Sequence, residues 1–568
     1  MEGDYLMQAP AQIKHRKAPL KTRLWNYKWF YVMFLPVFVA LIVFHYLPMF
    51  GISLAFFRYQ PSKIANPLEF TGLANFQKLF SRPQFWSSFT NTLEISIIKL
   101  LLNTFMAVII SLLLNEMVST KMKKLSQTII YLPHFMSWVV TAGVFGMLFA
   151  PTSAGLVNQV LIQMGLIDKE IYFLGDNDWW RFSYYIINIW HDTGWGTIIF
   201  MATLTGIDPA IYEAASIDGA GRWKKMRYIT LPALANTIVT VLVLNLAKIM
   251  NLFESVFVLQ NAAVYKTSQV LQTYVYYQTF NSGGNVNFGY TTAIGLFRSL
   301  VGMALVLICN QVSKKIRGRG RRNAIMQATA KEVKLPPVKK GKKNFSVFPF
   351  VNGLFFLLFC LFILVPLWKV LVDSLDLTTG YGMKLWPENF GLAGYQSVFS
   401  NPTLLRPLMI SVVTTVAGTF LGLFLSTVGA YVLIQWDMPG RNFFAGIMLF
   451  TMIFQGGMIP TYLVMKNLHL TNTLWVVILM PAINVYNLVL MRNFFEGIPA
   501  SLFESGRLLA DSDFLQNRPA AVQGGAGVHR PDVRRLLLER LHQLQALHHH
   551  RPEPVQLPDE AAFHHHGV

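Results

Sequence analysis

Long apolar segments separated by short polar loops dominate this chain. A helix needs about 20 predominantly apolar residues to cross the hydrocarbon core of a bilayer, and these segments reach that length. The pattern predicts an all-α polytopic membrane protein with about ten transmembrane helices, in a set of six and then a set of four. The predicted spans are 29–51, 92–116, 127–150, 183–206, 233–257 and 291–313, followed by 348–371, 406–434, 443–465 and 473–492.

Two stretches that lie 291 positions apart repeat one another. Residues 207–214 read IDPAIYEA and residues 498–505 read IPASLFES, and each follows a long apolar segment. The repeat indicates two membrane modules joined in tandem. We divide the chain into a polar N-terminal segment (1–26), a complete first module (27–318), a basic linker (319–346), a truncated second module (347–505) and a polar tail (506–568).

The positions of lysine and arginine predict the orientation. Basic clusters at 15–23, 121–124, 224–227 and 314–317 flank alternate spans of the first module. Basic loops stay in the cytoplasm, so we expect the N-terminus and all four clusters inside. Entering the second module from inside places the second repeat on the same cytoplasmic face as the first.

Composition agrees with a membrane protein and narrows the partners. The chain is 53% hydrophobic and 13% charged, whereas a soluble domain is about 25% charged. The net charge of +20 belongs to loops beside apolar spans, so it points to orientation and to no nucleic-acid partner. Cys309 and Cys360 both lie in apolar spans and make no disulfide framework or metal motif.

The linker and the tail differ from the membrane modules. Residues 314–346 are basic, contain Pro336 and Pro337 and show no apolar period, so we expect a flexible cytoplasmic segment whose charge could lie on anionic lipid. After Glu504 no apolar run is long enough to span. A soluble tail with a histidine tract is one interpretation. We favour translation in a shifted frame, because codons can be chosen for residues 534–541 that encode an aromatic-rich segment one base later.

A polar, basic string lies between the fourth and fifth spans: EAASIDGAGRWKKMRYITLP, from Glu213 to Pro232. Its first residues favour a helix, its glycines allow a tight turn, and Pro232 is expected to end the segment before the next span. An ordinary basic loop is the alternative. The residues expected to contact a partner are Glu213, Ala214, Ala215, Asp218, Gly219, Ala220, Lys224 and Pro232, with Glu504 in the second repeat.

This string resembles the cytoplasmic coupling loop of ABC-importer permeases, which docks onto the ATPase subunit. Residues 20–318 look like one permease subunit of the carbohydrate-uptake importers, in the polysaccharide-fragment branch. Residues 345–505 look like the partner subunit, and FQGGMIPTYLV (454–464) is similar to a segment typical of that partner. Residues 506–511 depart from the Asp-Gly-Ala that the family pattern has after the glutamate, which leaves the second docking site open.

The resemblance implies the type I ABC importer permease fold in a bacterial plasma membrane. It further implies binding-protein-dependent import of oligosaccharides by alternating access. The implied partners are an ABC ATPase subunit dimer, which binds ATP and Mg, an external sugar-binding lipoprotein and, as a further alternative, a separate intact permease subunit. The sequence has no GxxxxGK[ST] phosphate loop, so we expect the chain to be a transport component and no enzyme, with no cofactor bound directly.

Polar and aromatic residues inside the spans are the candidates for a sugar path, because exposing them to lipid is costly. Residues 245, 248, 251 and 254 recur at spacings of three in the fifth span, and Trp195 belongs to a cluster in the fourth. Pairing between helices or an interfacial belt are the alternatives. The candidates are His134, Trp138, Trp190, His191, Asp192, Asn245, Lys248, Asn251, Glu254, Gln455, Tyr462, Asn484 and Asn487. For an acidic sugar, Lys248 is the natural counter-charge.

Two other functions remain open from the sequence. An ion-coupled secondary transporter also uses internal repeats and midplane polar residues, but it has no use for a coupling loop. A fused, frame-damaged permease that does not transport is the other alternative.

Overall fold

The computed structural model describes residues 19–60, 68–152, 155–246, 248–281, 286–329, 347–378, 384, 386–435 and 437–496. The chain divides into two units, Met1–Gly497 and Ile498–Val568, and everything below concerns the first. Glu504 and the polar tail lie outside the described residues. The second coupling site and the frame shift therefore stay predictions.

Six continuous helical segments of the described chain are long and apolar enough to cross a bilayer. They are Lys28–Phe56, Pro83–Asn115, Arg222–Val243, Phe288–Cys309, Phe348–Leu375 and Pro402–Leu433. Two more candidates are bent pairs: Thr120–Phe135 with Trp138–Leu148, at 103°, and Asn177–Thr205 with Pro209–Ile217, at 71°. The all-α polytopic class is confirmed, but the expected ten continuous helices are not found in these residues.

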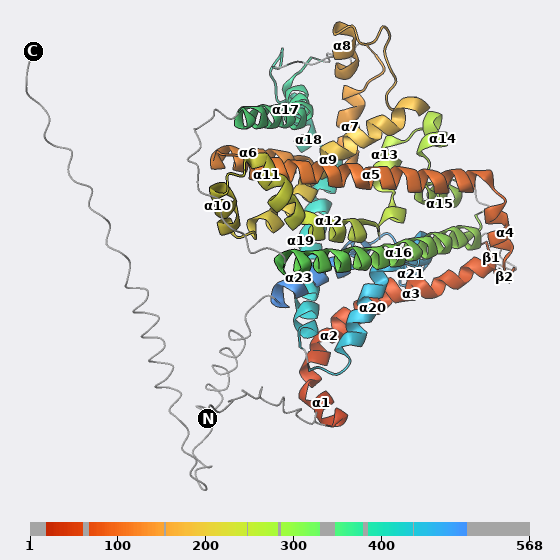
Figure 1. The fold of residues 1–568 in the computed structure, drawn as a ribbon. Coiled ribbons are helices and arrows are strands. Elements are labelled where there is room, and N and C mark those ends of the chain that lie inside the picture. Colours follow the sequence, from red (N-terminus) through yellow and green to blue (C-terminus); the bar gives the residue numbers. More distant parts are fainter. Residues whose placement is uncertain are drawn as a thin grey trace, which may run out of the picture. The chain divides into compact units, whose positions relative to one another are not determined.

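The first module contains most of the elements (Figure 1). They are α1 (Leu20–Asn26), α2 (Lys28–Leu41), η1 (Ile42–Tyr46), α3 (Leu47–Phe50), η2 (Gly51–Phe56), β1 (Phe57–Tyr59), β2 (Leu68–Phe70), α4 (Ala74–Phe80), α5 (Pro83–Asn115), α6 (Thr120–Tyr131), η3 (Leu132–Phe135), α7 (Trp138–Leu148), α8 (Leu156–Gln163), α9 (Asn177–Thr205), α10 (Pro209–Ile217), α11 (Arg222–Lys225), η4 (Met226–Thr230), α12 (Leu231–Leu246), η5 (Ile249–Asn251), α13 (Glu254–Leu259), η6 (Ala262–Val264), α14 (Tyr265–Ser268), α15 (Leu271–Phe280) and α16 (Phe288–Thr329). Strands β1 and β2 form a small antiparallel hairpin.

The second module is more interrupted than its hydrophobic pattern predicts. Its elements are α17 (Phe348–Leu375), α18 (Ala393–Ser400), α19 (Pro402–Leu433), α20 (Arg441–Ile453), α21 (Met458–Asn467), α22 (Leu474–Leu479) and α23 (Val485–Glu496). The spans expected at 443–465 and 473–492 were wrong as continuous helices. Gly457 adopts φ +92° between α20 and α21, and Pro481, which has no N–H to donate, lies between α22 and α23.

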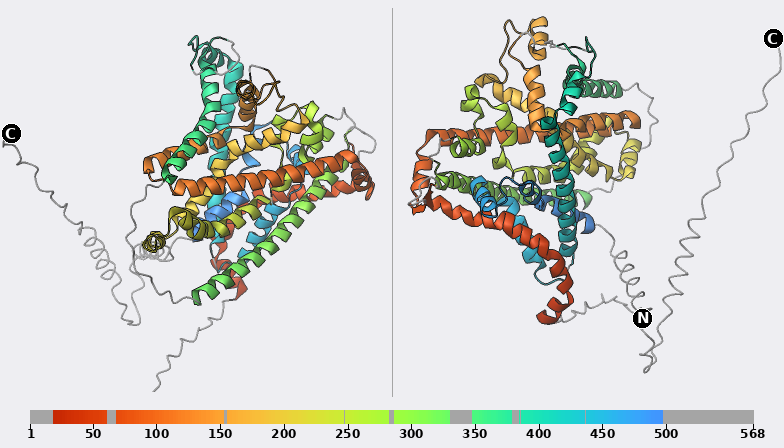
Figure 2. Two further views of the ribbon diagram at one scale, coloured as in Figure 1. Left: turned by 45° about the horizontal axis from the view of Figure 1, so that its top comes forward. Right: turned by 180° about the vertical axis from the view of Figure 1, so that it is seen from behind.

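The first helix of each module packs against the other module (Figure 2). Phe34 and Val37 of α2 share a hydrophobic core with Leu425 of α19. Reciprocally, α17 contacts α6 and α7, and the Asn352 side chain donates a hydrogen bond to the Leu113 carbonyl at 3.0 Å. The core of each module therefore includes a helix from the other.

A second contact between the modules joins α16 to the segment before α21. The hydroxyl of Ser299 donates to the carbonyl of Gln455 at 2.8 Å. A Cβ on Gly456 would lie 2.7 Å from the backbone of Pro48, so only glycine fits there. The FQGGMIP sequence thus allows the second module to pass close to the backbone of the first.

The helix before the linker is longer than we expected. Helix α16 continues to Thr329, past the point at which we expected the flexible linker to begin. Alanine, arginine, methionine and glutamine are good helix formers, and they make up six of the nine residues 321–329, so the absence of an apolar period did not end the helix. Residues 330–346 lie outside the described part of the chain.

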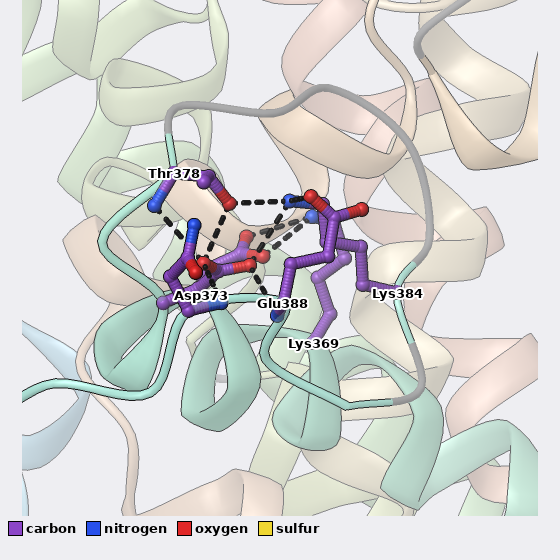
Figure 3. A network of polar contacts seen from close by, with 7 residues as sticks. Lys369, Asp373, Thr378, Lys384 and Glu388 are labelled. Carbon is purple, nitrogen blue, oxygen red and sulfur yellow. Dashed lines mark hydrogen bonds and ion pairs between the residues drawn. The ribbon is translucent and has the colours of Figure 1, made fainter.

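A polar cluster follows the end of α17 (Figure 3). The carboxylate of Asp376 accepts hydrogen bonds from the Thr378 hydroxyl at 2.6 Å, from Lys384 Nζ at 2.9 Å and from the backbone amides of Glu388 and Asn389 at 3.2 Å. The Thr378 hydroxyl bond is the largest cause that holds the pKa of Asp376 well below its usual range. The bond to Asp376 likewise raises the pKa of Lys384. This one carboxylate ties the end of α17 to the residues before α18.

Candidate functional site: a cavity between the two modules

A cavity of about 460 Å³ lies where the two modules meet, a size within the range of sites for small organic ligands. Helices α5, α9 and α12 with η5 supply most of its wall from the first module, and α20 and α23 close it from the second. Its polar and aromatic lining residues are Ser96, Lys99, Asn103, Thr104, His134, Asp192, Trp195, Asn245, Lys248, Asn251 and Tyr486.

Asn245, Lys248 and Asn251 line the cavity. They do so where the helix is broken, and not from the continuous fifth span that the sequence predicts. Helix α12 ends at Leu246, and the chain continues as the 3₁₀ turn η5. The backbone N–H of Lys248 donates to Asn245 O at 3.0 Å, and that of Asn251 donates to Lys248 O at 2.9 Å. Residues three apart eclipse one another in a 3₁₀ helix, so these three side chains share one face. A continuous span at 233–257 was wrong.

Glu254 does not line the cavity. Leu252 is extended, with φ −75° and ψ 112°, so the three-residue repeat stops there. Glu254 then begins the separate helix α13 and is exposed. Asn245, Lys248 and Asn251 therefore line the cavity and Glu254 does not, and their part in a sugar path stays a prediction.

Asp192 is the centre of a charged cluster in the cavity wall. Its Oδ2 lies 3.3 Å from Lys99 Nζ, and its Oδ1 lies 2.7 Å from His191 Nδ1. His134 Nδ1 is 3.7 Å from the same Oδ1, which is too long for a hydrogen bond. One carboxylate on α9 thus holds an ammonium group from α5 and orients a histidine.

Both ring nitrogens of His191 face hydrogen-bond acceptors. Nδ1 meets the Asp192 carboxylate, and Nε2 meets the Met136 carbonyl at 3.0 Å. A neutral imidazole has one N–H and satisfies one of these contacts, whereas the doubly protonated ring satisfies both. Together with Lys99, this arrangement surrounds a single carboxylate with donors.

Aromatic rings stack on both histidines of this cluster. Trp195 stacks on His134 with ring centroids 4.9 Å apart, and Trp138 stacks on His191 at 4.2 Å. Across the cavity, Lys248 Nζ lies 4.9 Å from the centre of the Tyr486 ring. Trp195 and Tyr486 are separated by 291 positions, the spacing of the sequence repeat. Each module therefore contributes one aromatic residue from an equivalent place.

The second span supplies cavity residues that the sequence reasoning missed. Ser96, Lys99 and Asn103 come from α5 and line the cavity. A lysine inside an apolar span is itself a signal of function, so Lys99 could have been found. Tyr486 had a signal too, since it corresponds to Trp195 under the repeat.

Several predicted path residues lie away from the cavity. Trp190 is fully buried and packs edge-to-face on Phe145, so it belongs to the core of the first module. Asn484 accepts hydrogen bonds from the backbone amides of Tyr486 and Asn487, so it caps α23. Trp138 and His191 lie behind the lining residues, whereas Gln455, Tyr462 and Asn487 are exposed outside this cavity.

His134, His191 and Asp192 are also a group that could hold a metal ion, with ligand atoms within 4.8 Å of one another. Lys99 opposes this use, because its ammonium already neutralises Asp192 and would repel a cation at the same oxygen atoms. The group therefore fits an ion-pair cluster better than a metal centre.

The predicted coupling string lies in a helix–turn–helix of the first module, formed by α10, a short turn and α11. Asp208 caps α10, its carboxylate accepting from the Ala210 amide at 2.9 Å. Glu213 and Ala214 are exposed on α10, Lys224 is exposed on α11, and so are Ile217 and Trp223, at 66% and 65%. Large apolar side chains on an exposed helix pair indicate an interaction surface.

The turn in this string depends on Gly219. Asp218 ends α10, Gly219 adopts φ +75°, and the Ala220 amide donates back to the Ala215 carbonyl at 2.9 Å. This is the usual way to end a helix with a left-handed residue. Pro232, by contrast, does not end the segment, because a continuous helical stretch runs from Arg222 to Val243. The π turn η4 precedes the proline, and a proline near the start of a helix is tolerated.

Residues 107–318 match the family described as "Binding-protein-dependent transport system inner membrane component". The chain is similar to the polygalacturonan/rhamnogalacturonan transport system permease protein YteP of Bacillus subtilis (strain 168), at 38% identity over 54% of this chain and 94% of YteP. It is similar to protein LplB of the same organism, at 37% identity over 52% of this chain and 91% of LplB.

Two further similarities were found. The polygalacturonan/rhamnogalacturonan transport system permease protein YtcP of Bacillus subtilis (strain 168) is 40% identical over 27% of this chain and 55% of YtcP. Among solved structures, a bacterial ABC transporter involved in the import of the acidic polysaccharide alginate is 34% identical over 52% of this chain and 99% of that chain, with a TM-score of 0.48. With its several membrane-spanning helices, the chain belongs to the family of inner membrane components of binding-protein-dependent transport systems.

Proposed function

We propose that this chain is the membrane component of an ATP-driven importer of acidic oligosaccharides. The observation that carries the proposal is the charge of the cavity between the modules. Lys99 and Lys248 place two ammonium groups in its lining, and Asp192 is the one carboxylate among the described lining residues. The carboxylate of a uronate would complete the charge balance. The similarity to YteP, a polygalacturonan/rhamnogalacturonan transport system permease protein, supports the same class of cargo.

The two modules would divide the recognition of the sugar. Lys248 lies over Tyr486, and both line the same cavity as Asp192 and Trp195. A sugar ring could stack on either aromatic face while its hydroxyls bond to Asn103, Asn245 or Asn251. Such a site is split when the modules move apart, and this is how alternating access would release the cargo.

The energy would come from separate ATPase subunits. The α10–α11 segment exposes Glu213 and a set of apolar side chains, and α10 meets α9 at 71°. A rigid push on α10 would therefore reach α9, which carries Asp192 and Trp195. We place this segment and the N-terminus in the cytoplasm, with a sugar-binding protein on the opposite face. An ion-coupled carrier would have no use for this exposed segment.

The cargo is tested by uptake in a strain that lacks its own permease and expresses this full chain with ATPase and binding-protein subunits of the family. With labelled trigalacturonate, Lys248→Met should raise the half-saturating concentration about tenfold, as expected for loss of one charge-assisted contact. Uptake of the methyl-esterified trisaccharide should not change. Lys466→Met, an exposed lysine outside the cavity, is the matched control. Equal losses for both cargoes would refute the acidic class, and no uptake by the unaltered chain would refute transport.

The energy source is tested by co-purification. Glu213→Lys should remove the ATPase subunits from the purified complex, whereas Glu170→Lys, an exposed glutamate far from α10 in sequence, should retain them. Uptake that survives Glu213→Lys but collapses with the ion gradient would favour a secondary transporter.

A further inference from the structure

Arg298 is a buried charge that has no partner among the residues the structure describes. It lies near the middle of the span Phe288–Cys309 and is 7% exposed. Among the described residues its guanidinium makes no hydrogen bond and no ion pair, although guanidinium groups inside spans normally pair with an anion or with carbonyl groups. A buried unpaired charge is strongly unfavourable, so its position calls for a counter-charge.

The surroundings of Arg298 supply donors and no acid. A small cavity of about 10 Å³ is lined by Arg298, Thr292, Gln272 and the start of α21, and no described lining residue is aspartate or glutamate. The hydroxyl of Thr292 is buried and has no hydrogen-bond partner. A charged donor and a neutral donor thus meet at one void.

The N-terminus of helix α21 lies at the same void and adds backbone N–H donors. Gly457 is its N-cap and provides no side-chain hydrogen bond, and Gly457 and Met458 both line the cavity. The first N–H groups of a helix have no acceptor within the helix, and the helix dipole places partial positive charge there. The positive charge of Arg298 and the partial positive charge of this helix terminus repel each other unless an anion lies between them.

We propose that this cavity binds a chloride ion, held by Arg298, the Thr292 hydroxyl and the N-terminus of α21. The uncapped terminus and the buried, unpaired arginine are independent observations, and both indicate an anion. The size of the void limits which anion it can hold. Room of about 10 Å³ is at the lower limit for one water molecule. Among anions a monoatomic one is nearest to this size, whereas a uronate, a phosphate or a sulfate is far larger. Because chloride is larger than water, the Arg298 side chain must shift slightly to admit it.

The site would join the two modules. Arg298 and Thr292 belong to α16 of the first module, and Gly457 and Met458 belong to the second. Helices α16 and α21 lie side by side (Figure 1). The ion would lie next to the contact between Ser299 and the Gln455 carbonyl. Chloride would therefore stabilise the contact between modules, independently of the sugar carried.

Thermal unfolding of the purified full chain tests this proposal. A ligand that binds the native state raises the melting temperature as its concentration rises. The midpoint should increase and saturate with sodium chloride or bromide, and stay constant with sodium gluconate at equal ionic strength. Arg298→Met should abolish the halide dependence, and Arg58→Met, an exposed arginine on β1, should preserve it. A midpoint that ignores halide in the unaltered chain, or a dependence that survives in Arg298→Met, would overturn the proposal.

Two further measurements keep the test independent of one variant. Thr292→Val should weaken the apparent chloride affinity about tenfold, the loss expected for one hydrogen bond, while the protein still folds. In crystals of the chain grown in bromide, an anomalous peak should lie beside Arg298. Density without an anomalous signal would mean that the cavity holds water, and the proposal would then be wrong.

Discussion

Trp195 and Tyr486 line one cavity from two different modules. Their separation of 291 positions equals that of Glu213 and Glu504 in the sequence repeat. Trp195 is stacked by His134, and Tyr486 is covered by the ammonium of Lys248. The repeat that was first visible in the coupling segment is thus present in the site as well, where it produces two aromatic surfaces, each with a polar partner.

Replacing either aromatic residue should weaken cargo binding. An aromatic surface in a binding site contributes about 1–2 kcal/mol, so Trp195→Ala and Tyr486→Ala should each raise the half-saturating oligosaccharide concentration roughly 5- to 30-fold. Trp195→Phe should retain most of the affinity because it keeps a stacking face. Uptake kinetics measure this. Trp475→Ala, exposed on α22 and outside the cavity, is the control with no effect on binding, and an equal effect there would contradict the assignment.

The turn of the predicted coupling segment should tolerate alanine at Gly221 and not at Gly219. A Cβ meets nothing within 4 Å at either Gly219 or Gly221, but Gly219 has φ +75° and Gly221 has φ −66°. A left-handed alanine costs about 1–2 kcal/mol. Hydrogen exchange of the Ala220 amide should therefore accelerate about 5- to 30-fold in Gly219→Ala and stay unchanged in Gly221→Ala. Equal exchange in the two variants would refute this geometry.

The contact between α9 and α6 should depend on Gly194. A Cβ there would collide with the carbonyl of Ile130, whereas Gly146 on α7 has open space around it. Overpacking of this kind costs about 1–3 kcal/mol. Gly194→Ala should lower the melting temperature of the detergent-solubilised protein, and Gly146→Ala should leave it unchanged or slightly higher, since alanine favours helix. A Gly194→Ala protein as stable as the unaltered chain would show that the helices are further apart.

The polar cluster after α17 should resist mild acid. The pKa of Asp376 is well below the ordinary value of about 3.9, chiefly because the Thr378 hydroxyl bonds to the carboxylate. Since the folded value is lowered, the ionised carboxylate stabilises the loop at every pH above the ordinary value. This contribution is lost only as the pH falls through the lowered one. Hydrogen exchange of the Glu388 and Asn389 amides, corrected for intrinsic rates, should stay slow from pH 7 to pH 5.

Asp376→Asn should make those two amides exchange quickly at neutral pH. Asp373→Asn is the matched control, because Asp373 pairs with Lys369 and accepts no bond from the loop amides. Loss of protection near pH 5 in the unaltered chain would show that the carboxylate is not held in its ionised form.

The hydrophobic pattern by itself determined that the protein is all-α and crosses the membrane several times, whereas the two modules and the coupling segment stay predictions. Apolar segments of spanning length have few alternatives in a bilayer, because every backbone polar group must be satisfied internally. The polar residues at 245, 248 and 251 were found for a similar reason, since their type is costly in lipid and their spacing is regular. Their continuation to Glu254 was wrong, because spacing does not reveal where a helix breaks.

Only the tertiary structure decided which polar residues meet. Lys99 and Asp192 are 93 positions apart in sequence, and no local pattern indicates that α5 and α9 pack together. Trp190 and Trp195 lie on the same helix, yet one is fully buried in the core and the other lines the cavity. Helix periodicity defines faces, but the neighbour of each face is set by packing between distant segments. For the same reason, neither the cavity nor the position of Arg298 beside the start of α21 could be predicted from the sequence.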